Sequence, residues 1–194
     1  WKKRAINFDQ MTNLSKSFRK LVEDNFIINA LVLSEAQVSK DRTIKNAFLL
    51  ADDSVIEGVL IPTKKRMTAC VSVQVGCSLD CAFCATGRLK RIRNLNADEI
   101  YDQVVMINDQ SKQEYNLPIS NIVYMGMGEP LLNYSNVLKS VDRITSENGL
   151  GMSPKRITIS TAGIHKKIIR LADDGVKFNL ALSLHAANDE KRNK

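Results

Sequence analysis

The hydrophobic positions of residues 96–184 alternate between two patterns. Short apolar runs typical of buried strands occupy residues 121–125, 156–160 and 178–184. Between and before these runs, apolar residues recur at the spacing of one helix face: Ile100, Val104 and Ile107, then Val137, Val141 and Ile144, then Ile164, Ile168 and Leu171. Asn96 and Glu99 are spaced as a capping pair for the first helix. Strands that alternate with amphipathic helices in this way predict parallel βαβ units with right-handed crossovers.

The first part of the chain has a different pattern. Apolar residues lie at helical spacing after two possible capping residues, Thr12 and Asn13, so we expect a small helical accessory region over residues 1–48. Residues 46–51, 55–62 and 67–75 have β-like patterns, and turn residues separate the first two runs. We therefore predict a β-hairpin or linker over residues 49–70, followed by a strand that leads to residue 77.

The predicted fold class is α/β, with residues 71–194 forming a partial parallel (βα) barrel. The strand before residue 77 and the three later runs make four strands, which is too few for an eight-stranded barrel. The chain begins at Trp1 rather than at Met and stops in a charged run after the last predicted strand. We interpret it as a truncated chain and expect the remaining strands beyond Lys194.

Composition is that of a globular protein. The chain has 194 residues, 44% of them hydrophobic, which is enough to bury a core. It contains neither a signal peptide nor an apolar run of membrane length, so we expect no membrane association and a cytoplasmic location. The formal net charge is +7, with basic runs at residues 64–66, 88–93 and 166–170. Such runs attract nucleic acids, but they are equally typical of solvated faces on a basic protein.

Three cysteines carry the most specific chemistry. Cys77, Cys81 and Cys84 are spaced C-x-x-x-C-x-x-C. Three thiolates can hold three irons of a 4Fe-4S cluster and leave the fourth iron open to a small molecule. The alternative is a structural zinc site, which normally needs four ligands, and the only other cysteine is Cys70. A disulfide pair is a weaker alternative because nothing places the chain in an oxidising compartment. We favour the cluster.

Unusual polar or glycine-rich segments follow the other predicted strands. They are G-M-G-E-P at residues 126–130, S-T-A-G at 160–163 and S-L-H at 183–185. In parallel α/β folds the carboxyl ends of the strands meet at one edge, so these segments should converge with the cysteines. Gly128 allows a ligand to approach the backbone closely, and Glu129 can accept hydrogen bonds from an ammonium group. Taken singly, Ser160, Ser183 and His185 are more typical of structural hydrogen-bonding groups.

Five segments of the chain carry a resemblance to a known family. They are C-V-S-V-Q-V-G-C-S-L-D-C-A-F-C-A-T-G, R-N-L, G-M-G-E-P-L-L-N-Y, I-S-T-A-G and S-L-H-A-A-N-D. In these segments the chain resembles the RlmN-type radical S-adenosylmethionine (SAM) methyltransferases, the RlmN/Cfr family. The resemblance extends to the N-terminal segment F-D-Q-M-T-N-L-S-K. It implies that Cys77, Cys81 and Cys84 hold a 4Fe-4S cluster. It also implies that SAM is bound by Gly128, Glu129, Ser160, Ser183, Leu184 and His185.

The resemblance further implies an activity and partners. Members of this family methylate carbon 2 of adenine in 23S rRNA and tRNA by means of a 5'-deoxyadenosyl radical. An electron donor such as flavodoxin or ferredoxin and a monomeric state would accompany this activity. Cfr enzymes methylate carbon 8 instead, and Pro130 favours the RlmN side. Two alternatives stay open: a radical SAM enzyme that acts on a non-RNA substrate, and a metal-stapled RNA-binding module.

Two more residues acquire roles from the resemblance. Cys70 would resolve a covalent protein–RNA adduct by forming a disulfide, and Glu57 would accept the proton from the substrate carbon. Without the resemblance, Cys70 is better explained as a small buried hydrophobe and Glu57 as the solvent face of a strand.

The chain departs from the family pattern at two places. The segment R-L-K-R-I-R-N-L, residues 88–95, lacks the Gly-Phe pair that usually precedes R-N-L. No cysteine follows Cys84, so the family's methyl-carrying cysteine is absent from this sequence. We therefore expect residues 1–194 alone not to complete the reaction.

Overall fold

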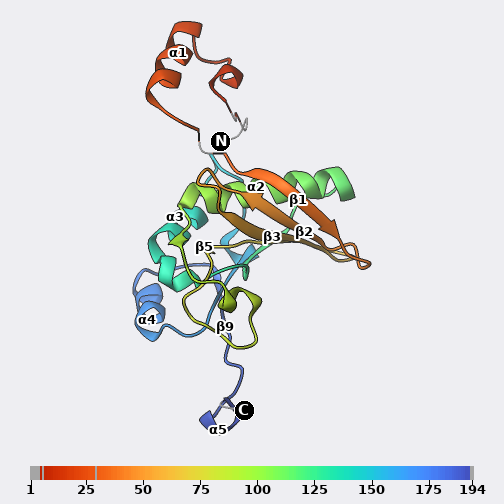
Figure 1. Ribbon diagram of the computed structural model, residues 1–194, viewed down its shortest axis with the longest axis vertical. Coiled ribbons are helices and arrows are strands. Elements are labelled where there is room, and N and C mark those ends of the chain that lie inside the picture. The colour runs from red at the N-terminus through yellow and green to blue at the C-terminus, as the bar shows by residue number, and fades with distance from the viewer. Residues whose placement is uncertain (1–4, 6, 29, 193–194) are drawn as a thin grey trace.

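A mixed seven-stranded sheet organises the computed structural model, which describes residues 5, 7–28 and 30–192 (Figure 1). In spatial order its strands are β1 (Val32–Val38), β2 (Ile44–Leu49), β3 (Val55–Pro62), β4 (Met67–Cys70), β7 (Asn121–Tyr124), β8 (Ile157–Thr161) and β9 (Asn179–Leu182). The first four are antiparallel neighbours, and β4, β7, β8 and β9 are parallel. The sheet is open, and the four predicted parallel strands of a partial barrel are confirmed.

Three helices connect the parallel strands in the predicted order. They are α2 (Ala97–Tyr115), α3 (Tyr134–Thr145) and α4 (His165–Asp173). Gly58 in β3 lets α2 approach closely, because a Cβ there would lie 2.7 Å from the ring of Phe48 and 3.2 Å from Ile107. The hydroxyls of Tyr124 in β7 and Ser140 in α3 lie 2.8 Å apart. One face of the sheet is therefore covered by helices.

The strand register places three predicted site residues on the opposite face. The paired residues across β3, β4, β7 and β8 are Val59 with Cys70, Cys70 with Val123, and Val123 with Thr158. Side chains alternate along a strand, so Glu57, two residues before Val59, shares this face, as does Ser160, two residues after Thr158. In a (βα) barrel this face lines the interior.

The N-terminal region differs from the prediction of a helical segment up to residue 48. Helix is confined to η1 (Phe8–Gln10) and α1 (Lys16–Asn25), which stand apart from the sheet in Figure 1. Ser15, rather than Thr12 or Asn13, caps α1, with its hydroxyl accepting from the N–H of Phe18 at 3.2 Å. Strand β1 and most of β2 occupy the rest. All seven residues of β1 are exposed at the sheet edge, so no alternation of buried and exposed positions marks it as a strand.

The predicted hairpin before the cysteines is present as β2 and β3, but the strand that follows is interrupted. β4 ends at Cys70, and β5 (Gln74–Val75) pairs with β6 (Arg93–Asn94) in a separate two-stranded ladder. The cysteines and η2 (Ala85–Arg88) lie in the loop between these two strands. Its ends are joined by hydrogen bonds from the N–H groups of Ile92 and Leu95 to the carbonyls of Val75 and Val73.

Three short helical elements lie outside the sheet. They are η3 (Pro130–Asn133), η4 (Pro154–Arg156) and α5 (Asp189–Arg192). Among the described helices, none has the length and apolar character needed to cross a membrane.

Candidate active site

A cavity of about 580 Å³ lies where the parallel strands end. It is lined by the cysteine loop, the segment after β7, the end of β8 and the segment after β9. All nine residues predicted from the sequence to hold a cluster or SAM line it: Cys77, Cys81, Cys84, Gly128, Glu129, Ser160, Ser183, Leu184 and His185. Segments far apart in the sequence thus meet at one edge of the sheet, as expected for parallel strands.

The three cysteines lie in this cavity as free, partly exposed thiols. A backbone hydrogen bond from the N–H of Cys84 to the carbonyl of Cys81, at 3.0 Å, keeps the second half of the motif compact. Burial raises the pKa of the Cys81 thiol, and charge on Cys77 and Cys84 raises it further. Within the described ranges, no three His, Cys, Asp or Glu side chains are grouped closely enough to hold a metal ion. The three sulfurs therefore share one cavity without forming a closed metal site.

The glycine-rich segment after β7 approaches β5 closely. Gly128 has a φ of 93°, and a Cβ at this position would lie 2.5 Å from the Cβ of Gln74. Only glycine tolerates both conditions. The N–H of Glu129 donates to Oε1 of Gln74 at 2.9 Å, which fixes the segment against the start of the cysteine loop.

Glu129 is 4% exposed and has a structural role that the sequence did not reveal. Its Oε1 accepts from the N–H of Leu131 at 3.0 Å, and its Oε2 accepts from the N–H of Ala162 at 2.8 Å. The carboxylate therefore joins the segment after β7 to the segment after β8. Each oxygen keeps a further lone pair, so the group can still accept a hydrogen bond from a ligand in the cavity.

The far wall of the cavity comes from β8 and the segment after β9. The hydroxyls of Ser160 and Ser183 lie 3.1 Å apart, as neighbouring strand ends bring them together. His185 has a φ of 58°, and its ring centroid lies 4.1 Å from that of Phe83 in the cysteine loop. This ring contact connects the two walls of the cavity that are most distant in sequence.

Comparison with known proteins gives the family. The model of the radical SAM superfamily matches residues 71–194. The chain belongs to this superfamily. Enzymes of the radical SAM superfamily use SAM together with a 4Fe-4S cluster, and the cavity offers three cysteine ligands beside an open space. This donor set fits a cluster with one open iron better than it fits a structural zinc site, which would need a fourth protein ligand.

The relatives of this radical SAM chain are longer proteins. The chain is 62% identical over 192 residues to the "Probable dual-specificity RNA methyltransferase RlmN" of Christiangramia forsetii. The match covers 99% of this chain and 54% of that protein. The chain is also 49% identical over 192 residues to the protein of the same name from Thermotoga neapolitana. That match covers 98% of this chain and 54% of the relative. The chain thus spans about half the length of the curated relatives it matches.

A solved structure supports the same relationship. The crystal structure of a radical SAM methyltransferase from Sphaerobacter thermophilus matches with a TM-score of 0.89 and 39% sequence identity. The match covers 98% of this chain and 56% of that chain. The resemblance to RlmN-type proteins indicated by the sequence motifs is thereby confirmed as a similarity over almost the whole radical SAM chain.

Cys70 and Glu57 lie outside the cavity lining of this radical SAM core. Cys70, at the end of β4, is 8% exposed, and its burial raises the pKa of the thiol to about 11. Glu57 is half-exposed, and its Oε1 lies 3.1 Å from Nζ of Lys45 in β2. Ser72 connects Glu57 to the cavity wall, because its hydroxyl donates to the Glu57 carbonyl and accepts from the N–H of Met127 at 2.8 Å.

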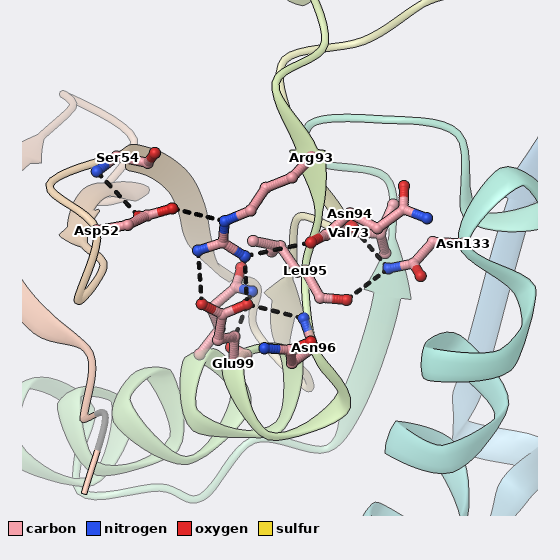
Figure 2. Close-up of polar contacts among 10 residues, drawn as sticks. Asp52, Ser54, Val73, Arg93, Asn94, Leu95, Asn96, Glu99 and Asn133 are labelled. Carbon is pink, nitrogen blue, oxygen red and sulfur yellow. Dashed lines mark hydrogen bonds and ion pairs between the residues drawn. The ribbon is translucent and has the colours of Figure 1, made fainter. Parts of the chain in front are cut away.

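Arg93 is a residue whose role the sequence did not indicate (Figure 2). Its guanidinium contacts Asp52, in the turn between β2 and β3, at 2.6 Å and makes two hydrogen bonds of 2.8 Å to the Glu99 carboxylate. The hydrogen bond from Arg93 lowers the pKa of Asp52 to about 2, and the pair with Glu99 raises the pKa of Arg93. Arg93 thereby holds the end of the cysteine loop against the hairpin and against α2. No spacing rule links residues 52, 93 and 99.

Proposed function

We propose that this protein is a radical SAM methyltransferase that adds a methyl group to carbon 2 of adenine in 23S rRNA and tRNA. The observation that carries the proposal is the single cavity lined by three cysteine thiols, a glycine-rich segment and two serine hydroxyls. The printed names of the relatives, which describe dual-specificity RNA methyltransferases, support RNA as the substrate class. We propose as well that it acts in the cytoplasm, as a monomer that receives electrons from a flavodoxin or ferredoxin.

The proposed roles follow the walls of the cavity. A 4Fe-4S cluster on Cys77, Cys81 and Cys84 would supply the electron that cleaves SAM into methionine and a 5'-deoxyadenosyl radical. The backbone at Gly128 and the free lone pairs of Glu129 would orient the amine of the methionine moiety. These two residues are already fixed by contacts with Gln74 and with Ala162, so they would need little rearrangement on binding.

The serine wall would hold the other end of SAM. The paired hydroxyls of Ser160 and Ser183 can donate to a carboxylate or to ribose oxygens. The backbone of Leu184 and His185 faces the same cavity and would contact the adenosine.

Cys70 and Glu57 would act on the substrate rather than on SAM. Both lie on the sheet face that a (βα) barrel turns toward its interior, beside the strand ends that form the cavity. In the role proposed for Cys70 the thiolate attacks an adduct sulfur, whereas the buried resting group is a thiol. Glu57 would accept the proton from the substrate carbon, and its partner Lys45, 3.1 Å away, holds the carboxylate in position.

The test is an anaerobic assay of the full-length protein. Iron and acid-labile sulfide are measured first, then SAM cleavage under reduction, and finally methylated nucleosides in added RNA by mass spectrometry. The proposal expects about four irons per chain, 5'-deoxyadenosine and 2-methyladenosine. Zinc without sulfide would favour a metal-stapled RNA-binding module, 8-methyladenosine a Cfr-type reaction, and SAM cleavage with unmodified RNA a different substrate.

A further inference from the structure

A second cavity, of about 460 Å³, lies between β6, η3, α3 and α4. The short helix η3 borders both this cavity and the one lined by the three cysteines, which we call the SAM cavity. Pro130 lines the SAM cavity, whereas Leu132 and Asn133 line the second. A ligand that reaches over η3 can therefore contact both. We call this second cavity, lined by Asn94, Asn133, Lys139, Lys167 and Arg170 among others, the outer cleft.

Positive charge dominates the outer cleft. Lys139, Lys167 and Arg170 line it, opposed by the single carboxylate of Asp142. Among the residues that the structure describes, Lys139 and Lys167 form no ion pair, and Arg170 reaches Asp174 only at 3.7 Å. Lys139 and Lys167 are therefore available to an anion, whereas Arg170 shares its charge with Asp174.

Two of the three cations, Lys167 and Arg170, are held in place by the ring of Tyr134. Nζ of Lys167 lies 5.1 Å from the centroid of the Tyr134 ring, and Cζ of Arg170 lies 4.8 Å from it. The Tyr134 side chain is itself fixed, because its hydroxyl donates to Asp174 at 2.6 Å and the residue is buried. Positioned cations lose less conformational entropy on binding than free surface lysines do.

The outer cleft is also coupled to the SAM cavity through amide side chains. Nε2 of Gln74 donates to Oδ1 of Asn94 at 2.7 Å, and Nδ2 of Asn94 donates to the Leu132 carbonyl at 3.4 Å. Gln74 is the same residue that fixes Glu129. The relative position of the two cavities is thus set by a continuous chain of hydrogen bonds.

We propose that the outer cleft binds backbone phosphates of the RNA that neighbour the target adenine. The inference rests on the proposed function, since it assumes an RNA substrate over the SAM cavity. Lysine ammonium and arginine guanidinium groups match phosphate oxygens. The Asn94 amide, which donates one N–H to the Leu132 carbonyl, has a second N–H that can act as a neutral donor. The Tyr134 residue is buried, so its ring offers no free face for base stacking. The cleft therefore contributes affinity and register rather than recognition of base identity.

The test compares two triple variants with the same charge change. Lys139→Gln/Lys167→Gln/Arg170→Gln removes the cations of the outer cleft. Lys64→Gln/Lys65→Gln/Arg66→Gln removes three exposed cations from the turn before β4, at the opposite edge of the parallel strands. Binding of a fluorescein-labelled RNA stem-loop is followed by fluorescence anisotropy over a range of KCl concentrations.

The outer-cleft variant should lose affinity and salt dependence together. Each phosphate contact contributes about −0.7 to the slope of log K against log salt concentration, so the loss of three contacts should make that slope less steep by about 2. The same loss should raise Kd roughly 50-fold at about 0.15 M salt. The double variant Lys139→Gln/Lys167→Gln, which keeps the Arg170–Asp174 contact, should raise Kd roughly 15-fold. The variant in the turn before β4 should bind like the unchanged protein, and SAM cleavage without RNA should be equal in all of them.

Three results would overturn the inference, and they separate its failure from that of the proposed function. If the unchanged protein binds and methylates RNA while the outer-cleft variants bind as tightly, the cleft has no role and the function stands. If both triple variants weaken binding equally, the effect is general charge. If the unchanged protein fails to bind RNA at all, the proposed function falls and the cleft inference with it.

Discussion

The carboxylate of Glu129 accepts a hydrogen bond from the backbone N–H of Ala162 at 2.8 Å, which joins the segment after β7 to the segment after β8. The same carboxylate accepts from the N–H of Leu131, so both oxygens are engaged inside the protein. A residue whose type points to ligand binding therefore also holds together two walls of the cavity. Substitutions at this position have to be judged on stability as well as on SAM binding.

Glu129→Gln should destabilise the protein by about 1–3 kcal/mol, because the amide group would face a backbone N–H with its own donor and leave it unpaired. Urea unfolding measures this change. Glu114→Gln, at an exposed position in α2, is the matched control and should stay within about 0.5 kcal/mol of the unchanged protein. Equal unfolding free energies for the two variants would show that the Glu129 contacts contribute nothing.

The same variant should also weaken the effect of SAM on the EPR signal of the reduced, reconstituted protein. Ser160→Ala provides the comparison, because it removes another proposed SAM ligand while the hydrogen bond between Glu129 and Ala162 is kept. A full SAM effect in Glu129→Gln would remove Glu129 from the proposed ligands.

The parallel part of the fold could be predicted because its signals are local. Strands β7 and β8 are short runs with buried residues such as Ile122 and Ile157, and α2 and α3 carry buried residues at helical spacing. The convergence of the nine cavity residues follows from one rule, that parallel strands end at the same edge. No knowledge of side-chain contacts was needed for either inference.

The features that sequence could not predict depend on contacts between distant residues. The exposed edge strand β1 has no buried face, and the break after Cys70 reflects the pairing of β5 with β6. The Lys45–Glu57 pair follows from strand register, and the Arg93 contact with Asp52 joins segments 41 residues apart. Each of these requires the tertiary arrangement to be known first.

Arg93→Gln should lower the free energy of unfolding by about 2 kcal/mol, since it removes charge-assisted hydrogen bonds to Asp52 and Glu99. Arg93→Lys should recover part of this loss, because it keeps the charge without the two-pronged geometry. Arg91→Gln is the control, since Arg91 is exposed and makes one long contact of 3.3 Å with Asn94.

The measurement is urea unfolding combined with limited proteolysis of the cysteine loop, residues 76–92. Faster cleavage of that loop in Arg93→Gln than in Arg91→Gln would support a clamping role. Identical cleavage rates would show that the loop is held by its backbone ladder alone.

The contact between Asp52 and Arg93 should make stability depend on pH in an acidic window. The folded-state pKa of Asp52, about 2, lies below its ordinary value, so its contribution is present above about pH 4 and is lost as pH falls toward 2. Asp52 is 43% exposed, so solvent screening keeps the contribution small.

Asp52→Asn tests this window. Above about pH 4, the unfolding free energy of this variant should be lower than that of the unchanged protein by a constant amount. Between about pH 4 and pH 2 this difference should shrink. Urea unfolding of both proteins at several pH values measures this difference. A difference that persists undiminished down to the acid end would contradict a role for the Asp52 charge.

Cys70 should behave differently from the three cavity cysteines. Replacing Cys77, Cys81 or Cys84 by Ala should abolish iron binding, whereas Cys70→Ala should retain it, because Cys70 lies outside the cavity on β4. SAM cleavage should likewise persist in Cys70→Ala. Loss of iron in that variant would make Cys70 a structural residue.

The proposed resolving role of Cys70 has a consequence for RNA release. In the full-length protein, Cys70→Ala should accumulate covalently bound to RNA, which denaturing gel electrophoresis detects. Because burial raises the pKa of the thiol to about 11, its thiolate fraction rises about tenfold per pH unit in the neutral range. Release of RNA from the unchanged protein in a single turnover should therefore accelerate from pH 7 to pH 9. Free, normally methylated RNA from Cys70→Ala would remove this role, because the adduct would then resolve without the Cys70 sulfur.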